Sequence, residues 1–149
     1  MMVDGVGHMN MPEFEGLTQG QVEALMQRIH SVPIIDTLQM DILRVSPGEC
    51  DAFVPRAEKW DGIYKTFHGG MLATIADTVT CWAILTLAGA ETKVATTDFN
   101  VRFLAPCNTG VVCHGKVLKF GRTLCPAEAE IRDENKKLVA VAQVTYIRL

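Results

Sequence analysis

The sequence lacks the features that mark several large classes of protein. Its five cysteines form no CxxC pair and are odd in number, which argues against a disulfide framework or a zinc ribbon and favours a reducing, cytoplasmic location. The 14 lysine and arginine residues form no run, and the formal net charge is −3, so a nucleic-acid surface is not expected. The first residues have neither the basic nor the apolar region of a signal peptide. What remains is a chain of 149 residues, long enough for one domain with a buried core.

Charge is nearly absent from residues 71–90, where Asp77 is the only charged residue. The segment reaches the roughly 20 residues of a membrane span. However, Asp77 and several threonines reduce its apolar content, and no positive cluster flanks it, so no membrane span is expected. A helix that is apolar nearly all round is better enclosed by its own protein. An ionised acid on such a helix costs several kcal/mol unless it is compensated, which makes Asp77 a candidate functional residue.

The N-terminal half of the chain predicts one short helix and two strands. Residues 1–17 are expected to be a disordered lead-in, and residues 18–149 a single domain. Thr18-Gln19-Gly20-Gln21 has the form of a capping box, and apolar residues at helical spacing predict an amphipathic helix from about Thr18 to His30, which ends before Pro33. The two strands are predicted over residues 35–45 and 49–54, and a loop over residues 55–67.

After Gly89 the pattern changes from helical to alternating. Four strands are predicted, with short turns between them, over residues 93–104, 110–120, 124–133 and 138–149. Strands on both sides of one buried helix indicate an α+β domain, in which an antiparallel sheet curls around that helix.

Four motifs resemble, in order and spacing, the hotdog-fold acyl-CoA thioesterases of the phenylacetate-degradation and 4-hydroxybenzoyl-CoA thioesterase type, within the thioesterase superfamily. They are His68-Gly69-Gly70, Ile75-Ala76-Asp77-Thr78, Asp98-Phe99-Asn100-Val101-Arg102-Phe103-Leu104-Ala105-Pro106 and Leu118-Lys119-Phe120-Gly121-Arg122-Thr123. The resemblance spans roughly residues 35–149. It implies a hotdog fold and hydrolysis of an acyl-CoA or aryl-CoA thioester, with coenzyme A as part of the substrate and no separate cofactor or metal.

The chemistry of the motif agrees with this resemblance. Thioester hydrolysis passes through a tetrahedral oxyanion, which needs fixed N–H donors and a base or nucleophile near the carbonyl carbon. A helix N-terminus supplies such donors, so Gly69 is the candidate donor and Gly70 keeps the approach open. Asp77 is the candidate nucleophile or general base, and the sequence does not choose between these roles.

The spacing of Gly69 and Asp77 predicts a shared site. Eight residues along a helix correspond to about 12 Å. Groups that serve one thioester should lie within roughly 7 Å of each other. Two antiparallel helices at a two-fold axis solve this problem, with Gly69 of one protomer facing Asp77 of the other. A homodimer is therefore expected, and the resemblance implies that such dimers often pair into tetramers.

The resemblance also assigns further positions. Thr96 lies where related enzymes often place a hydroxyl that holds water or the acid, and His68 has a structural, substrate-positioning or catalytic part. Related sequences often carry Asn or Gln six residues before the motif histidine, where this chain has Gly62. Arg122 in the hairpin after Gly121 is the first candidate for the coenzyme A phosphates. Lys119 and Arg102 are weaker candidates for the same role. The residues expected to line the acyl pocket are Trp60, Phe67 and Met71.

Two other functions remain open at this stage. A non-catalytic acyl-CoA-binding module would keep the fold, and the missing amide at Gly62 is compatible with it. A hotdog hydratase or dehydratase would need a histidine and an acid poised across one substrate, whereas His68 and Asp77 lie nine residues apart on one helix. Free-thiol release distinguishes hydrolysis from both.

Overall fold

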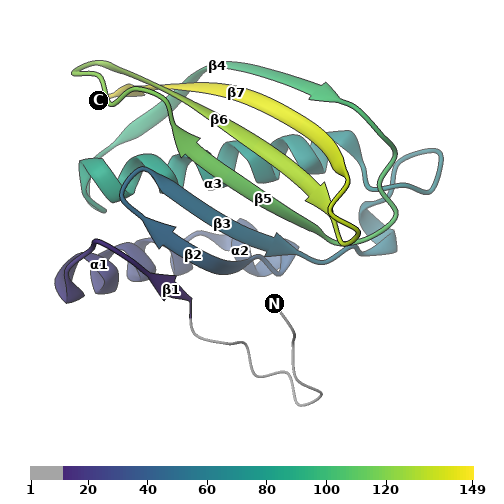
Figure 1. Cartoon of the computed structure of the whole chain (residues 1–149), viewed down its shortest axis with the longest axis horizontal. Helices are drawn as coiled ribbons and strands as arrows, with labels where there is room; N and C mark the ends of the chain where they lie inside the picture. The colour runs from purple at the N-terminus through teal and green to yellow at the C-terminus, as the bar shows by residue number, and fades with distance from the viewer. Residues whose placement is uncertain (1–11) are drawn as a thin grey trace.

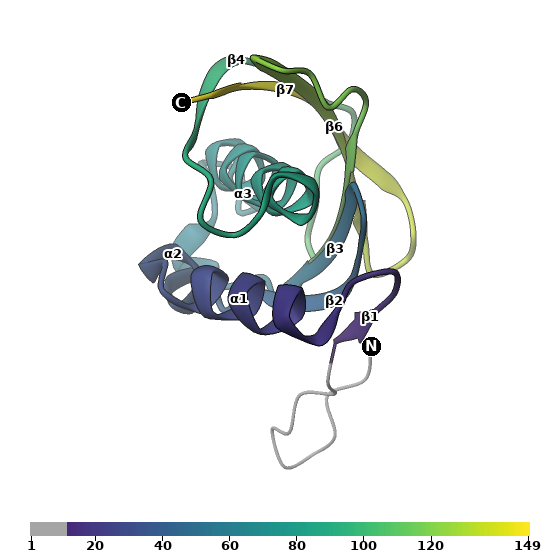
Figure 2. The same ribbon diagram turned by 90° about the vertical axis from the view of Figure 1, so that its left-hand side faces the viewer.

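In the computed structural model, which describes residues 12–149, a curved sheet wraps around one long helix (Figure 1; Figure 2). The sheet has seven strands in the order β1-β2-β3-β5-β6-β7-β4. β1 runs parallel to β2, and all the other neighbours are antiparallel. The elements are β1 (Glu13–Phe14), α1 (Gln19–His30), α2 (Pro33–Leu38), β2 (Asp41–Ser46), β3 (Glu49–Val54), the 3-10 turn η1 (Glu58–Trp60), α3 (Gly69–Ala88), β4 (Val94–Phe103), β5 (Val111–Val117), β6 (Leu124–Asp133) and β7 (Leu138–Arg148).

Helix α3 occupies the centre of the fold, because most of its surface is apolar and contacts the concave face of the sheet. The approach is close at Gly115 of β5. A Cβ atom at this glycine would lie 3.1 Å from Val79 Cγ1 and 3.3 Å from the backbone nitrogen of Thr80, so the absence of a side chain lets the helix backbone reach the sheet. The length and hydropathy of α3 would suit a membrane span, but 56% of the relevant window is buried inside the fold. Burial by the sheet therefore accounts for its composition.

Helix α1 begins at the predicted capping box. The backbone N–H of Gln21 donates to Thr18 Oγ1 over 3.2 Å, and the backbone N–H of Thr18 donates to Gln21 Oε1 over 2.8 Å. Leu25 and Ile29 are buried, and the helix lies beside α3 in the view of Figure 2. The predicted helix from Thr18 to His30 is confirmed.

The strand predicted over residues 35–45 is wrong in its first half. Pro33 starts the short helix α2, because proline at the first helical position leaves no N–H unpaired and has the required φ angle. Gln39 then adopts the left-handed conformation, with φ of 53°, and ends α2 before β2 begins. The apolar run that suggested a strand instead supplies the buried side of α2, since a short run fits either element.

The predicted lead-in over residues 1–17 extends too far. β1 pairs with β2, and the backbone N–H of Glu15 donates to the carbonyl oxygen of Val45 over 3.1 Å. Pairing with a strand distant in the sequence orders this segment. Residues 1–11 of the prediction lie outside the described residues.

The remaining elements agree with the predicted order. β3 and β6 have the predicted bounds, and the central helix begins at Gly69, where its N-terminus was predicted. The predicted loop over residues 55–67 contains η1. The predicted architecture, an antiparallel sheet around a long central helix, is confirmed, and it is the hotdog fold.

Candidate active site

The N-terminus of α3 presents one free backbone donor. His68 caps the helix, and its Nδ1 atom accepts a hydrogen bond from the Gly70 N–H over 2.8 Å. Only an unprotonated nitrogen accepts, so the neutral ring carries its proton on Nε2. Within residues 12–149, the Gly69 N–H has no hydrogen-bond acceptor. The Gly69 N–H is therefore free to donate to an oxyanion, whereas the Gly70 N–H is bound by the side chain that caps the helix.

The carboxylate of Asp77 is held by two hydroxyl groups of the sheet. Asp77 is half-buried on α3, and its Oδ1 atom accepts from Thr96 Oγ1 over 2.8 Å and from the Tyr146 hydroxyl over 2.7 Å. The Tyr146 hydroxyl also contacts the main-chain oxygen of Asp77. Two donors on one oxygen offset part of the cost of placing a charge in this apolar surrounding. The structure thus brings Thr96 and Asp77 together.

A β-bulge in β4 places Thr96 on the helix-facing side of the sheet. Thr96 pairs with Tyr146 and Asp98 pairs with Thr145, so Thr97 is an extra residue between the two pairs. In a regular strand residues i and i+2 point to the same face, so without the bulge Thr96 would share the outer face with Asp98. The bulge therefore lets the Thr96 hydroxyl reach the carboxylate of Asp77.

A cavity of about 380 Å³ lies beside the N-terminus of α3. Gly69, Phe67 and Phe103 all line it, and a Cβ atom at Gly69 would lie 3.1 Å from the Phe103 ring. Met71 is half-buried on the first turn of α3 and packs against the core. Trp60 lies in a separate hollow of about 100 Å³, beneath the side chain of the neighbouring lysine. Of the three predicted lining residues, Phe67 therefore lies in the Gly69 cavity and Trp60 does not.

The predicted cations occupy two different places. Lys119 and Arg122 are exposed in the connection between β5 and β6. Arg148, which the sequence did not single out, stacks over the Phe120 ring in the same region, 4.5 Å from the ring centre. Arg102 instead lines a groove with polar residues of β4, β6 and β7 on the outer face of the sheet. The sheet therefore separates Arg102 from the helix that carries Asp77.

Gly62 lies close to the N-terminal cap of α3. A Cβ atom at this position would lie 3.7 Å from His68 Cδ2. A side-chain amide here would reach the entrance of the helix, and glycine leaves that space open.

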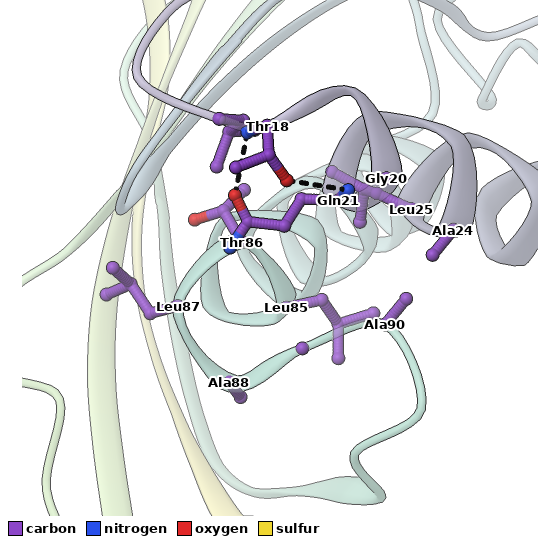
Figure 3. Close-up of a pocket in the computed structure, with 12 residues that line it drawn as sticks. Thr18, Gly20, Gln21, Ala24, Leu25, Leu85, Thr86, Leu87, Ala88 and Ala90 are labelled. Carbon is purple, nitrogen blue, oxygen red and sulfur yellow. Dashed lines mark hydrogen bonds between the residues drawn. The ribbon is translucent and has the colours of Figure 1, made fainter.

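Asp77 and Gly69 do not share a cavity in one chain. The Gly69 cavity does not include Asp77, and neither does a cavity of about 490 Å³ between α1 and the last turn of α3, shown in Figure 3. The residues that line this larger cavity carry no ionisable side chain, so it supplies no acid or base. Along α3, the donor and the acid are separated by about 12 Å.

Sequence reasoning missed Tyr146, the second side chain that contacts the Asp77 carboxylate. Its alternation with Val144 predicts only that both side chains face the same side of a strand. The alternation does not show that β7 pairs with β4, or that Tyr146 lies opposite Thr96, because strand pairing is non-local.

The fold and the motif at the start of α3 define a hotdog thioesterase. The family model of the thioesterase superfamily matches residues 64–140, and the chain therefore belongs to that superfamily. Thioester hydrolysis is accordingly its class of function.

Known proteins agree with this assignment. Acyl-coenzyme A thioesterase 13 of Mus musculus is 29% identical over 126 residues, which cover 81% of this chain and 89% of that protein. A thioesterase family protein from Silicibacter pomeroyi has a TM-score of 0.82 at 25% identity, covering 87% of this chain and 98% of its own. The E. coli PaaI protein from the phenylacetic acid degradation operon has a TM-score of 0.77 at 18% identity, covering 87% of this chain and 96% of its own, and supports the fold alone.

Proposed function

We propose that this protein hydrolyses an acyl-CoA or aryl-CoA thioester to the free acid and coenzyme A, at a site shared between two copies of the chain. The observation that carries the proposal is the pair of groups on α3: a free amide at Gly69, and the hydroxyl-bound carboxylate of Asp77. Similarity to acyl-coenzyme A thioesterase 13 supports coenzyme A as the leaving group.

Each of the two groups has a defined role in this reaction. The Gly69 N–H donates to the carbonyl oxygen and stabilises the negative charge that grows on it. Asp77 either attacks the carbonyl carbon, forming a mixed anhydride that water then hydrolyses, or takes a proton from the water that attacks it. In both routes the bond from carbon to sulfur breaks, and the thiolate of coenzyme A leaves and takes up a proton.

The free edge of the sheet supports assembly through β4. This strand has ten residues and, within residues 12–149, pairs on one side only, with β7. Phe99, Phe103 and Leu104 at this edge are 37%, 54% and 54% exposed. A long edge strand with exposed apolar side chains is normally paired or covered, and a second copy would do both.

Helix α3 also has a stripe that the fold leaves partly exposed. Gly70, Thr74, Asp77 and Cys81 follow at helical spacing, and each is exposed or half-buried, whereas the intervening apolar residues are mostly buried. An antiparallel copy of α3 on this stripe would bring the partner's free amide to the acid, within the roughly 7 Å that one thioester needs.

The proposed assembly is a homodimer with two sites. The resemblance to the hotdog thioesterases further implies that two such dimers pair into a tetramer. Lys119 and Arg122 are the cations available to the coenzyme A phosphates, since both are exposed. The reaction needs no separate cofactor. A cytoplasmic location fits the five free cysteines.

Complementation between two inactive variants tests the shared site. Asp77→Asn removes the base or nucleophile and should lower kcat by orders of magnitude, while sedimentation shows an intact dimer. Gly69→Pro removes the donor N–H and keeps the helix start, because proline suits the first helical position, and it should lower kcat by about 100- to 1,000-fold. After random exchange of protomers, about one quarter of the sites should contain both intact groups and regain activity.

The control variant is Gly69→Ala, which adds the same Cβ atom against Phe103 but keeps the N–H. It should retain far more activity than Gly69→Pro. Thiol release from a panel of acyl-CoA and aryl-CoA thioesters provides the readout. Wild-type turnover by Asp77→Asn would refute the assigned acid, and no recovery in the mixture would refute the shared site. Binding without thiol release would favour the acyl-CoA-binding module, and a change in enoyl absorbance without thiol release would favour the hydratase.

A further inference from the structure

The two carboxylate oxygens of Asp77 have different surroundings. Oδ1 accepts hydrogen bonds from both Thr96 and Tyr146, over 2.8 Å and 2.7 Å. Within the described part of the chain, Oδ2 accepts no hydrogen bond. One oxygen is therefore anchored to the sheet, and the other is available for a substrate or a water molecule.

Tyr146 reaches this carboxylate from inside the core. Its side chain is 2% exposed, and it stands on β7 directly opposite Thr96 of β4. Its hydroxyl lies 3.0 Å from Oγ1 of the fully buried Thr80, one turn beyond the acid on α3. The tyrosine hydroxyl is thus enclosed between the helix and the sheet.

The direction of these hydrogen bonds follows from the proton inventory. An ionised carboxylate only accepts, so the single hydroxyl proton of Tyr146 points to Asp77. Burial, together with the nearby Asp77 charge, raises the pKa of Tyr146, so that its hydroxyl remains protonated and a donor. Thr80 does not compete for this proton with a carboxylate, and its own hydroxyl donates to the main-chain oxygen of Ala76 over 2.8 Å.

We infer that Tyr146 is a positioning residue for the acid: with Thr96 it fixes Oδ1, and so makes Oδ2 the oxygen that attacks the thioester or deprotonates water. The reactive role of Oδ2 rests on the proposed function. The contact of Tyr146 with Asp77 rests on the geometry alone. Two donors on one oxygen define the plane of the carboxylate, and a carboxylate free to turn would often point its lone pairs away from the substrate.

Tyr146→Phe tests this inference, because it removes the hydroxyl and keeps the buried ring. We expect kcat to fall about 10- to 100-fold, with KM changed by less than about two-fold. Thr96→Val, which removes the other donor to Oδ1, should act in the same direction.

The matched control is Thr145→Val, on the same strand and the opposite face. It removes a hydroxyl that does not contact the acid and should leave both kcat and KM unchanged. A wild-type kcat in Tyr146→Phe, or a change that appears only in KM, would overturn the positioning role.

A readout that needs no turnover separates this inference from the proposed function. The free energy of unfolding of Tyr146→Phe, Asp77→Ala and the double variant forms a double-mutant cycle. We expect the two changes to be non-additive, and additive effects would overturn the contact between Tyr146 and Asp77. A wild-type protein that releases no thiol from any CoA thioester would instead overturn the proposed function, whatever the result of the cycle.

Discussion

The imidazole of His68 accepts a hydrogen bond from the backbone amide of Gly70, and it thereby closes the first turn of α3. The same contact leaves the adjacent amide of Gly69 free, because a side-chain cap satisfies only one of the unpaired donors at a helix N-terminus. A structural cap and a free donor are therefore built from three consecutive residues.

Substitution of His68 distinguishes capping from catalysis. His68→Asn supplies another side-chain acceptor and should keep both the free energy of unfolding and most of the thioesterase activity. His68→Ala removes the acceptor and should lower the free energy of unfolding by about 1 kcal/mol. Chemical denaturation and kcat measured on both variants check this prediction. A loss of kcat in His68→Asn as large as that in Asp77→Asn would show that the imidazole takes part in the chemistry.

Close packing of α3 on β5 predicts a stability difference between two glycines. In Gly115→Ala the new methyl group would meet Val79 and the backbone of Thr80 at 3.1 to 3.3 Å, so the helix must shift. We expect a loss of about 1–3 kcal/mol in the free energy of unfolding. Gly20→Ala is the control, because no atom lies within 4 Å of its Cβ position in α1, and it should stabilise by about 0.5 kcal/mol. Equal effects of the two substitutions in urea denaturation would contradict the close approach.

Cys81 should be an unreactive thiol at neutral pH despite its partial exposure. Burial, and after it the Asp77 carboxylate, raise the pKa of Cys81 to about 11, which favours the neutral thiol. At pH 8 about one molecule in a thousand then carries the thiolate, against about a quarter for an unperturbed cysteine. Alkylation by iodoacetamide, followed by mass spectrometry of the Cys81 peptide, should be roughly 100-fold slower than alkylation of a free cysteine. The rate should rise with pH.

The same measurement has an internal control. The other four cysteines, all within the described residues, are buried. Asp77→Asn removes the neighbouring charge and should increase the alkylation rate of Cys81. A rate like that of a small thiol in the wild type would contradict the raised pKa.

A charge on the free edge of the sheet should disrupt the proposed assembly. Phe99→Lys places an ammonium group on β4, where the side chain is 37% exposed, and charged edge residues oppose pairing between strands. We expect sedimentation velocity to show a shift from dimer to monomer, with thioesterase activity lost in parallel. The control is Leu149→Lys, which also replaces an exposed apolar residue, 76% exposed, but lies at the chain terminus outside β4. An active monomer would show that one chain completes the site alone.

Local sequence patterns were sufficient to predict most of the helices and strands. They failed where the same pattern fits both a helix and a strand. The alternating runs and turn residues predicted β3 and β6 with their observed bounds. The apolar run after Pro33 was assigned to a strand, because a short apolar segment fits a buried helix equally well. β1 was missed because two residues form a strand only when a partner strand is present.

The candidate site divides in the same way. Gly69 and Asp77 could be placed on one helix from the sequence, because helical spacing is a local property and eight residues set their separation. The positions of the two hydroxyls that hold the acid depend on which strands are neighbours and on one extra residue in β4. Neither feature can be predicted from a single segment of the sequence. The sequence by itself determined the elements, their order and the reactive group types. Only the tertiary structure decided that Thr96 and Tyr146 meet at one oxygen of Asp77, because strand pairing joins residues that are far apart along the chain.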